Sequence, residues 1–305
     1  MKQKFDNFNN SFWKKIKNII KLYHLNFLFD TIGEDYLSEE EREFLENGLG
    51  KTKLNRDKIP LLDKIFAFGK IAEKIGLENA NKITKKDLDK FIQENTNKNI
   101  QEELNKIKSQ AYLDILGKQY KIEKDLRQGI LNEQNKKEFK ISNIVDYIKE
   151  KFEDWSYLKD SISYVSECAL NQGKVEEIKS KSDSEDPLVY KVPIQDEKLC
   201  PNCRKAYLNS DGTPKIFKLS ELEENGTNIG KKPNAWLPTL GMMHPHCRCL
   251  LQYFEEVPNT SKNDYEFDEN KNRYILKEQI VNNTERKVQR KSKVKITIGD
   301  KKFEV

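Results

Sequence analysis

The chain has 305 residues, of which 36% are hydrophobic and 34% are charged. Because this charged share is well above the ~25% of typical globular domains, little apolar material is left for one large central core. The net charge of +5, from 55 basic and 50 acidic residues, is too small to indicate a nucleic-acid-binding surface over the whole chain. The composition fits an elongated protein that completes its burial against neighbouring molecules. It also fits an ordinary soluble protein from an AT-rich genome.

The sequence predicts neither secretion nor membrane insertion. Its first residues, Met1–Phe8, lack the apolar region of about 7–15 residues that secretory leaders contain. No apolar stretch approaches the ~20 residues of a membrane-spanning helix. The five cysteines are therefore expected to be reduced and available to a metal. A disulfide in a particle exposed to oxidising surroundings is the alternative.

Proline placement separates a helical part of the chain from a loop-rich part. No proline occurs between Pro60 and Pro187, which predicts helices, whereas seven prolines crowd the stretch from Pro193 to Pro258 and predict loops and short strands. Ser38 and Thr84 each precede an acidic residue by three positions, a pattern typical of a helix N-terminus. Apolar residues at helical spacing predict helices over the ranges 12–29, 62–75, 100–115, 141–148 and 161–179.

Short strands are predicted in the loop-rich part and at the end of the chain. The apolar run Leu188–Val192 follows a polar, turn-rich segment, and Tyr253–Phe254 is expected to continue a strand paired with another. Alternating apolar residues on both sides of Gly299–Asp300 predict a terminal β-hairpin.

Four of the five cysteines and two of the three histidines fall in one window of the sequence. Two thiols separated by two residues can hold one metal ion from a tight turn, and a second pair of ligands completes a tetrahedron. Cys200 and Cys203 are the expected first pair. His244 and Cys249 are the expected second pair with Cys247 as an alternate thiolate, and an all-cysteine site is the rival. The candidate ligands for these four positions are Cys200, Cys203, His244, His246, Cys247 and Cys249.

The surplus of protein ligands favours a closed structural zinc site over an open catalytic one. Structural zinc sites fill all four positions from the protein. A redox-active Cys-x-x-Cys pair is an alternative, but it leaves the segment 244–249 unexplained. No acid that could orient a Cys–His nucleophile is evident, so no enzyme is predicted. Cys168, in the helical part, is interpreted as a small buried apolar residue.

These patterns predict an α+β fold class. The expected architecture has a mainly helical N-terminal body, a small loop-and-strand zinc-binding module and an extended tail with a terminal β-hairpin. The predicted divisions are 1–99 for an N-terminal helical region, 100–182 for a helical body, 183–257 for the Cys/His metal-binding module and 258–305 for the tail.

The two ligand-bearing segments have a more specific pattern than a general metal site. Asp196–Cys203 reads Asp-x-x-x-Cys-x-x-Cys, His244–Cys249 reads His-Pro-x-Cys-Arg-Cys, and a proline-bearing loop lies between them. This pattern resembles the hallmark of the phage Mu F-like, or SPP1-type, head-morphogenesis (minor capsid) protein family. Ala169–Lys174 is similar to the Ala-x-Asn-x-Gly-Arg/Lys of an upstream helix in that family. The Arg-Thr-Glu expected on that helix is absent, and the loop after Cys203 is longer than expected.

The resemblance covers roughly residues 100–255 and implies a virion protein that acts in prohead assembly near the portal. The implied partners are the portal and the major capsid protein. The implied locations are the host cytoplasm during assembly and then the virion, with no membrane contact. The alternative is a metal-dependent nucleic-acid-binding protein that acts in DNA packaging or ejection.

Two further groups of charged side chains bear on these hypotheses. Arg248 lies between two candidate ligands, so we expect it to point away from the metal and to pair with Asp196, or else to be solvated. A basic run near the end of the chain predicts either a solvated tail or a weak contact with DNA phosphates. Its candidate contact residues are Arg286, Lys287, Arg290 and Lys291.

Overall fold

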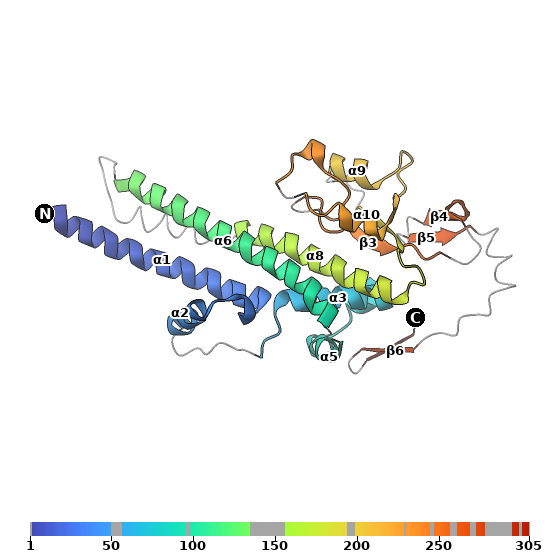
Figure 1. Cartoon of the computed structure of the whole chain (residues 1–305), viewed down its shortest axis with the longest axis horizontal. Coiled ribbons are helices and arrows are strands. Elements are labelled where there is room, and N and C mark those ends of the chain that lie inside the picture. The colour runs from blue at the N-terminus through green and yellow to red at the C-terminus, as the bar shows by residue number, and fades with distance from the viewer. Residues whose placement is uncertain are drawn as a thin grey trace. The chain divides into compact units, whose positions relative to one another are not determined.

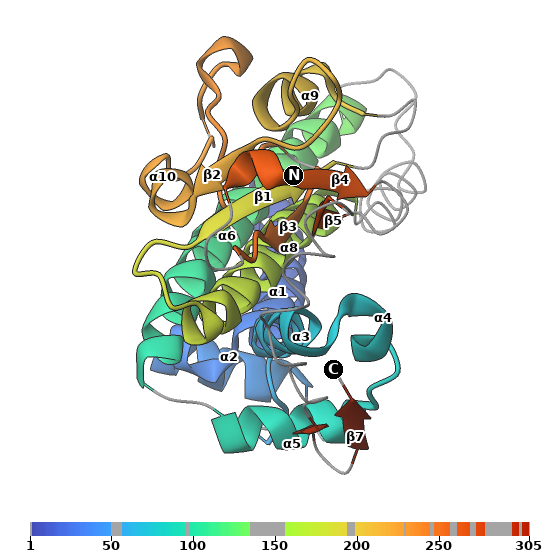
Figure 2. The ribbon, with the colours of Figure 1, turned by 90° about the vertical axis from the view of Figure 1, so that its right-hand side faces the viewer.

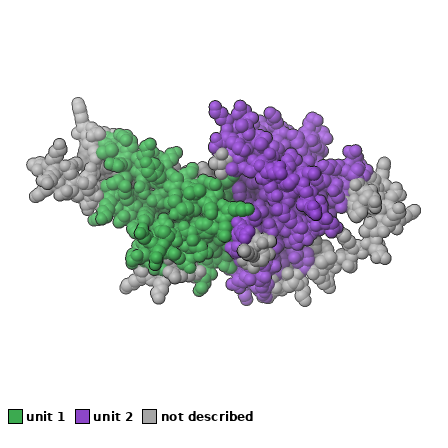
Figure 3. Space-filling view, in the orientation of Figure 1, with its two compact units in different colours: residues 1–63, 104–165 green, residues 64–103, 166–305 purple. Residues whose placement is uncertain are grey.

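The structure is a computed structural model, and Figure 1 traces its helices and strands. It describes residues 2–49, 57–95, 98–134, 156–193, 199–228, 230–244, 247–256, 261–268, 273–277, 295–298 and 301–304. The chain divides into two compact units (Figure 3). Unit 1 comprises residues 1–63 and 104–165, and unit 2 comprises residues 64–103 and 166–305. None of the described helices is long and apolar enough to cross a membrane.

The described part of unit 1 is helical. It contains α1 (Lys2–Ile32), the short 3₁₀ helix η1 (Glu34–Tyr36), α2 (Glu39–Leu49) and most of α6 (Lys98–Gln134). The predicted start of α2 is confirmed, because the Glu41 amide donates to Ser38 Oγ at 3.2 Å and the Ser38 amide donates to the Glu41 carboxylate at 2.9 Å. The buried apolar side chains of these helices include Ile20, Leu28, Leu45, Ile115 and Leu126.

Two helices of unit 2, α3 and α8, pack closely against each other. The helices of this unit are most of α3 (Leu61–Ile75), α4 (Leu77–Ala80), α5 (Lys85–Asn95) and most of α8 (Ser156–Lys181). A Cβ atom at Gly173 would lie 1.9 Å from the Phe66 carbonyl oxygen, and one at Gly69 would lie 2.1 Å from the Leu170 carbonyl oxygen. The two backbones are therefore in direct contact where α3 meets α8. This contact explains why unit 2 includes residues 64–103, which the sequence divisions grouped largely with residues 1–63.

A three-stranded antiparallel sheet forms the centre of the part of the chain predicted as a metal-binding module. It contains β1 (Leu188–Val192), β2 (Ile216–Lys218) and β3 (Leu250–Tyr253) in the order β2–β1–β3. Between β1 and β3 the chain forms α9 (Pro201–Tyr207), α10 (Leu219–Glu224) and the 3₁₀ helix η2 (Pro233–Ala235) (Figure 2). The module was expected to consist of loops and strands, and α9 and α10 correct that expectation. Both are short helices stabilised by buried side chains, which include Tyr207, Leu219 and Leu222.

A separate two-stranded hairpin packs on this sheet. It follows the 3₁₀ helix η3 (Lys262–Asp264) and pairs β4 (Tyr265–Asp268) with β5 (Arg273–Leu276). The rings of Tyr265 and Phe254 lie 4.7 Å apart, and those of Tyr190 and Tyr274 lie 5.0 Å apart. The extended tail expected after residue 257 is therefore corrected for residues 265–268 and 273–276. Aromatic burial against β1 provides the stabilisation that an isolated hairpin would lack.

The terminal hairpin is present as predicted. β6 (Lys295–Ile298) pairs with β7 (Lys301–Glu304), and the predicted turn residues Gly299 and Asp300 between them lie outside the described residues. Ile298 is only 1% exposed, and it joins an apolar cluster with residues of α3, α4 and α5.

Most of the elements predicted from the sequence are confirmed, and several of the helices are longer in the structure than the predicted ranges. The helices expected over 12–29, 62–75, 100–115 and 161–179 correspond to α1, α3, α6 and α8, and the strand expected over 188–192 is β1. α3 ends at Ile75, and Gly76 follows with a positive φ of 82°, a conformation that favours glycine. The helix expected over 141–148 lies outside the described residues.

Candidate metal centre

Two separate stretches of unit 2 supply the candidate ligands. Cys200 is the N-terminal capping residue of α9, and Cys203 lies in its first turn. Pro201 occupies the start of the helix, where its fixed φ suits the helix and its missing N–H is not needed. The second stretch runs from His244 to Cys249, directly before β3. The helix start and the strand start thus bring the two halves of the sequence motif together.

The described ligand atoms form two overlapping groups of three. One group contains Cys200, Cys203 and His244, and the other contains Cys203, Cys247 and Cys249. Within each group all ligand atoms lie within 4.8 Å of one another. Cys203 belongs to both groups, so the five side chains form one connected cluster. This arrangement could hold a metal ion.

The distance between two of the sulfurs matches a metal site and excludes a disulfide. Cys203 Sγ lies 3.8 Å from Cys247 Sγ. A Zn–S bond of ~2.3 Å places two sulfurs of one tetrahedron about 3.8 Å apart, whereas a disulfide needs about 2.05 Å. All five cysteines are free thiols in the structure. His244 Nε2 lies 3.1 Å from Cys203 Sγ, which is a hydrogen-bonding distance.

The thiols of the second group differ in how readily they lose a proton. A hydrogen bond from Cys203 lowers the pKa of Cys247, and the same contact raises the pKa of Cys203. The hydrogen bond with Cys203 lowers the pKa of Cys249, but the hydrogen bond with Cys247, burial and the charge on Cys247 outweigh it and raise this pKa to about 12. Within this group Cys247 is the thiol whose pKa is lowered, and a thiolate is the form of cysteine that binds metal.

The loop before His244 is fixed by hydrogen bonds from polar side chains. We call residues 237–241 the 237–241 loop. Asn228 donates to the Leu237 carbonyl at 2.9 Å and accepts from the Leu237 amide at 3.1 Å, and Asn225 donates to the Pro238 carbonyl at 2.8 Å. The His244 ring stacks on Trp236 with a centroid distance of 5.8 Å. These contacts set the position from which His244 approaches the cysteines.

Lys191 of β1 is a fully buried lysine that binds the same loop. Its ammonium donates to the carbonyls of Thr239 at 3.3 Å and Leu240 at 3.1 Å, and also to that of Gly241. Burial alone would lower the pKa of Lys191, but the nearby Tyr207 and cysteine side chains raise it above its ordinary value. Lys191 is therefore charged, and its charge lies close to the thiol cluster.

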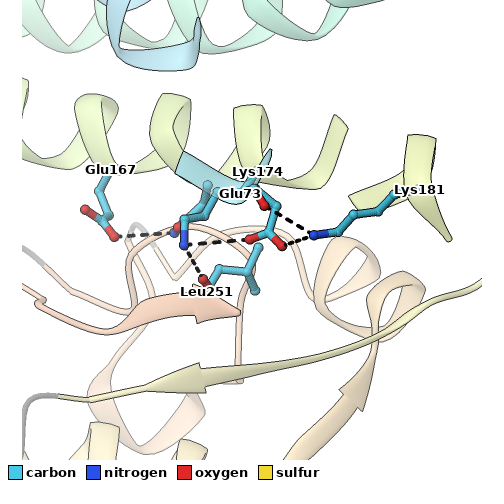
Figure 4. Close-up of polar contacts among 6 residues, drawn as sticks. Glu73, Glu167, Lys174, Lys181 and Leu251 are labelled. Atoms are coloured by element: carbon cyan, nitrogen blue, oxygen red, sulfur yellow. Dashed lines mark hydrogen bonds and ion pairs between the residues drawn. The ribbon is translucent and has the colours of Figure 1, made fainter. Parts of the chain in front are cut away.

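Helix α8 holds both ends of the second ligand stretch. Asn171, which is fully buried, donates to the Leu240 carbonyl at 3.1 Å. Lys174 donates to the Leu251 carbonyl at 2.7 Å, two residues after Cys249 (Figure 4). Asn171 and Lys174 belong to the Ala169–Lys174 segment singled out from the sequence. Their contacts connect that helix to the segment from Leu240 to Leu251.

Lys174 is also part of a buried ion-pair network. Its ammonium lies 3.9 Å from Glu73 Oε2 of α3, and Lys181 lies 2.6 Å from the other oxygen of Glu73 (Figure 4). Burial lowers the pKa of Lys174, and Glu73 opposes that effect. Burial also disfavours the charged form of Glu167 on the same helix, and it therefore raises the pKa of that carboxyl group. The network ties α3, α8 and β3 together beside the metal centre.

We expect Lys174→Met to destabilise unit 2 by about 2–3 kcal/mol. The change leaves the Leu251 carbonyl without its side-chain donor and removes one of the two lysines that contact Glu73. The loss should be smaller than for breaking an isolated buried pair, because Lys181 still contacts Glu73. Urea unfolding measures it. The matched control is Lys179→Met on the same helix, whose partly exposed pair with Glu223 at 2.9 Å should be worth less than ~1 kcal/mol. Equal effects of the two changes would contradict the role given to Lys174.

The remaining sequence-predicted residues are placed as follows. Arg248 is exposed, as expected for a residue between two ligands that point inward. Asp196 and His246 lie outside the described residues, so the Arg248–Asp196 pair stays a prediction. The basic residues Arg286, Lys287, Arg290 and Lys291 also lie outside them. Cys168, expected to be buried, is half-buried, and its sulfur lies close to the backbone of Gly241.

Comparison of the chain with protein-family models, with curated proteins and with solved structures finds no match. The function is therefore argued from the motif and from the geometry of the site.

Proposed function

We propose that this chain is a structural protein of phage head assembly, a minor capsid or head-morphogenesis protein that acts near the portal. One observation carries the proposal. Five residues of the two motif segments that resemble the head-morphogenesis family form two overlapping groups of possible metal ligands that share Cys203: Cys200, Cys203, His244, Cys247 and Cys249. The match is thus to residues that share a site.

We further propose that the centre holds one structural zinc ion. Zinc is bound by tetrahedral sets of cysteine and histidine, and a closed set of protein ligands is typical of structural sites. Burial of Cys203, Cys247 and Cys249 fits such a closed site. Bound zinc would join the start of α9 to the stretch before β3, and it would thereby fix the long connection between β1 and β3.

The assembly role is tested by partner capture. The full chain, expressed with a portal protein and a major capsid protein from the same genome, should copurify with the portal and be incorporated into proheads. Failure of both would contradict the proposal. The alternative, a nucleic-acid-binding protein, predicts DNA binding whose affinity falls steeply as salt concentration rises. DNA binding without portal binding would favour it.

A redox role for Cys200 and Cys203 is the alternative use of the same site. The position of Cys200 at the start of α9 is a feature that redox-active Cys-x-x-Cys pairs share. The two roles differ in the state of the purified protein under reducing conditions. A structural zinc site predicts bound metal and thiols protected from alkylation, whereas a redox pair predicts a metal-free protein with a reversible disulfide.

A further inference from the structure

The C-terminal hairpin of β6 and β7 is a separate piece of unit 2. Its strands pair with each other in a two-stranded sheet of their own, with Ile296 opposite Phe303 and Ile298 opposite Lys301. A two-stranded hairpin is only marginally stable by itself in water. Its order therefore depends on the surface against which it packs.

That surface is formed by residues close together in sequence. We call it the helical cradle, and it is made by α3, α4 and α5. Ile298 is 1% exposed within it, Ile296 packs at its edge, and Figure 2 shows β7 next to α5. The buried residues of the cradle are Ala67, Ile71, Ala72, Ile75, Ala80 and Phe91. The cradle thus consists of residues 67–91, and the hairpin comes from the far end of the chain.

The connection between β5 and the hairpin is long compared with the size of a domain. Residues 278–294 join the two, and a chain segment of that length can span at most about 60 Å. A compact domain of the size of unit 2 is on the order of 40 Å across. Covalent linkage therefore allows the hairpin to reach the cradle of a neighbouring copy as well as its own.

We propose that the hairpin is exchanged between copies of this chain, so that Ile296 and Ile298 of one copy complete the helical cradle of another. Exchange reproduces the same contacts, because apolar packing of Ile298 does not require the hairpin to come from the same chain. The protein concentration then sets the balance between docking of the hairpin within one chain and its exchange between copies. Short peptide links between two binding parts generally give effective concentrations on the order of 1 mM, so we expect exchange to need a local protein concentration of that order.

The exchange is tested with full-length chains that carry two different affinity tags. One tagged form has a photo-crosslinking side chain in place of Ile296. After mixing at about 1 mM, we expect mixed-tag adducts whose crosslinks map to residues of α3 and α5, and their fraction should grow with concentration. Adducts confined to single copies at every concentration would overturn the proposal.

Two variants of the crosslinkable form complete the test. Ile298→Asp should reduce mixed-tag adducts at least about tenfold, because a carboxylate in the apolar cradle opposes docking. Unchanged adducts would show that the copies associate elsewhere. Deletion of residues 281–290 shortens the link and should raise the mixed-tag fraction about tenfold at equal concentration, since short links hinder docking within one chain. A shortened chain that gives no increase would overturn the proposal.

Discussion

Cys203→Ser is expected to abolish metal binding, lowering the zinc content from about one ion per chain to less than about 0.1. Cys203 is the residue shared by both groups of ligands, so no described set of three ligands survives its loss. A serine hydroxyl is a poor replacement for a thiolate, which is the form of cysteine that binds zinc. Elemental analysis of protein purified under reducing conditions measures the content. Wild-type protein without metal under those conditions would contradict the zinc proposal.

The matched control is Cys168→Ser, the same substitution at a half-buried cysteine that belongs to neither group. It should leave the zinc content unchanged. The two variants should also differ in their response to a chelator. Binding free energy contributes to folding at structural zinc sites, so a chelator should lower the thermal midpoint of the wild type and of Cys168→Ser. It should have no effect on Cys203→Ser. Zinc retained by Cys203→Ser would show that the metal is held elsewhere.

The sequence predicts well those features that depend on local patterns. The sequence predicted the helices α1, α3, α6 and α8, the capping residue Ser38 and the pairing of β6 with β7, because each depends on residues within a few positions of one another. The ligand-bearing segments were also visible, because metal ligands are restricted to few residue types at short spacings. Their convergence on Cys203 required the structure.

The features missed by the sequence analysis depend on partners far away in the chain. Lys174 and Lys191 look like surface residues in the sequence, and both are buried because backbone carbonyls about 50–80 positions later accept their hydrogen bonds. Nothing near either lysine in the sequence signals this. The β4–β5 hairpin did carry a signal, since Tyr265 and Phe267, and also Tyr274 and Leu276, alternate with other residues at the strand period.

The short helices of the metal-binding module were missed for a different reason. α9 and α10 are too short to form without tertiary contacts, and the prolines of this part of the chain, Pro201 among them, predicted loops and short strands. A proline at the first position of a helix is compatible with both readings. Packing of Tyr207 and its hydrogen bonds with Thr239 decide in favour of the helix, and these contacts join residues more than 30 positions apart.

Gly173→Ala and Gly117→Ala are expected to change stability in opposite directions although the substitution is the same. A Cβ atom at Gly173 would lie 1.9 Å from the Phe66 carbonyl oxygen and 3.0 Å from the Lys70 amide nitrogen. These are backbone atoms of α3, so the helices must separate, and we expect a loss of about 3 kcal/mol in the free energy of unfolding. A Cβ atom at Gly117, on α6, would have no neighbour within 4 Å. There alanine should stabilise the helix by about 0.5–1 kcal/mol.

Hydrogen exchange of the amides in α8 and α6 measures the two effects separately, because it reports the stability of each helix. Separation of α3 from α8 should also disturb Lys174, the residue after Gly173, which binds the Leu251 carbonyl next to the metal centre. Gly173→Ala is therefore expected to lower zinc affinity as well, whereas Gly117→Ala should leave it unchanged. If Gly173→Ala kept wild-type protection in α8, the two helices would not be in the backbone contact described. If it lost protection in α8 but kept its zinc affinity, the contacts of Asn171 and Lys174 would not be what positions the ligands.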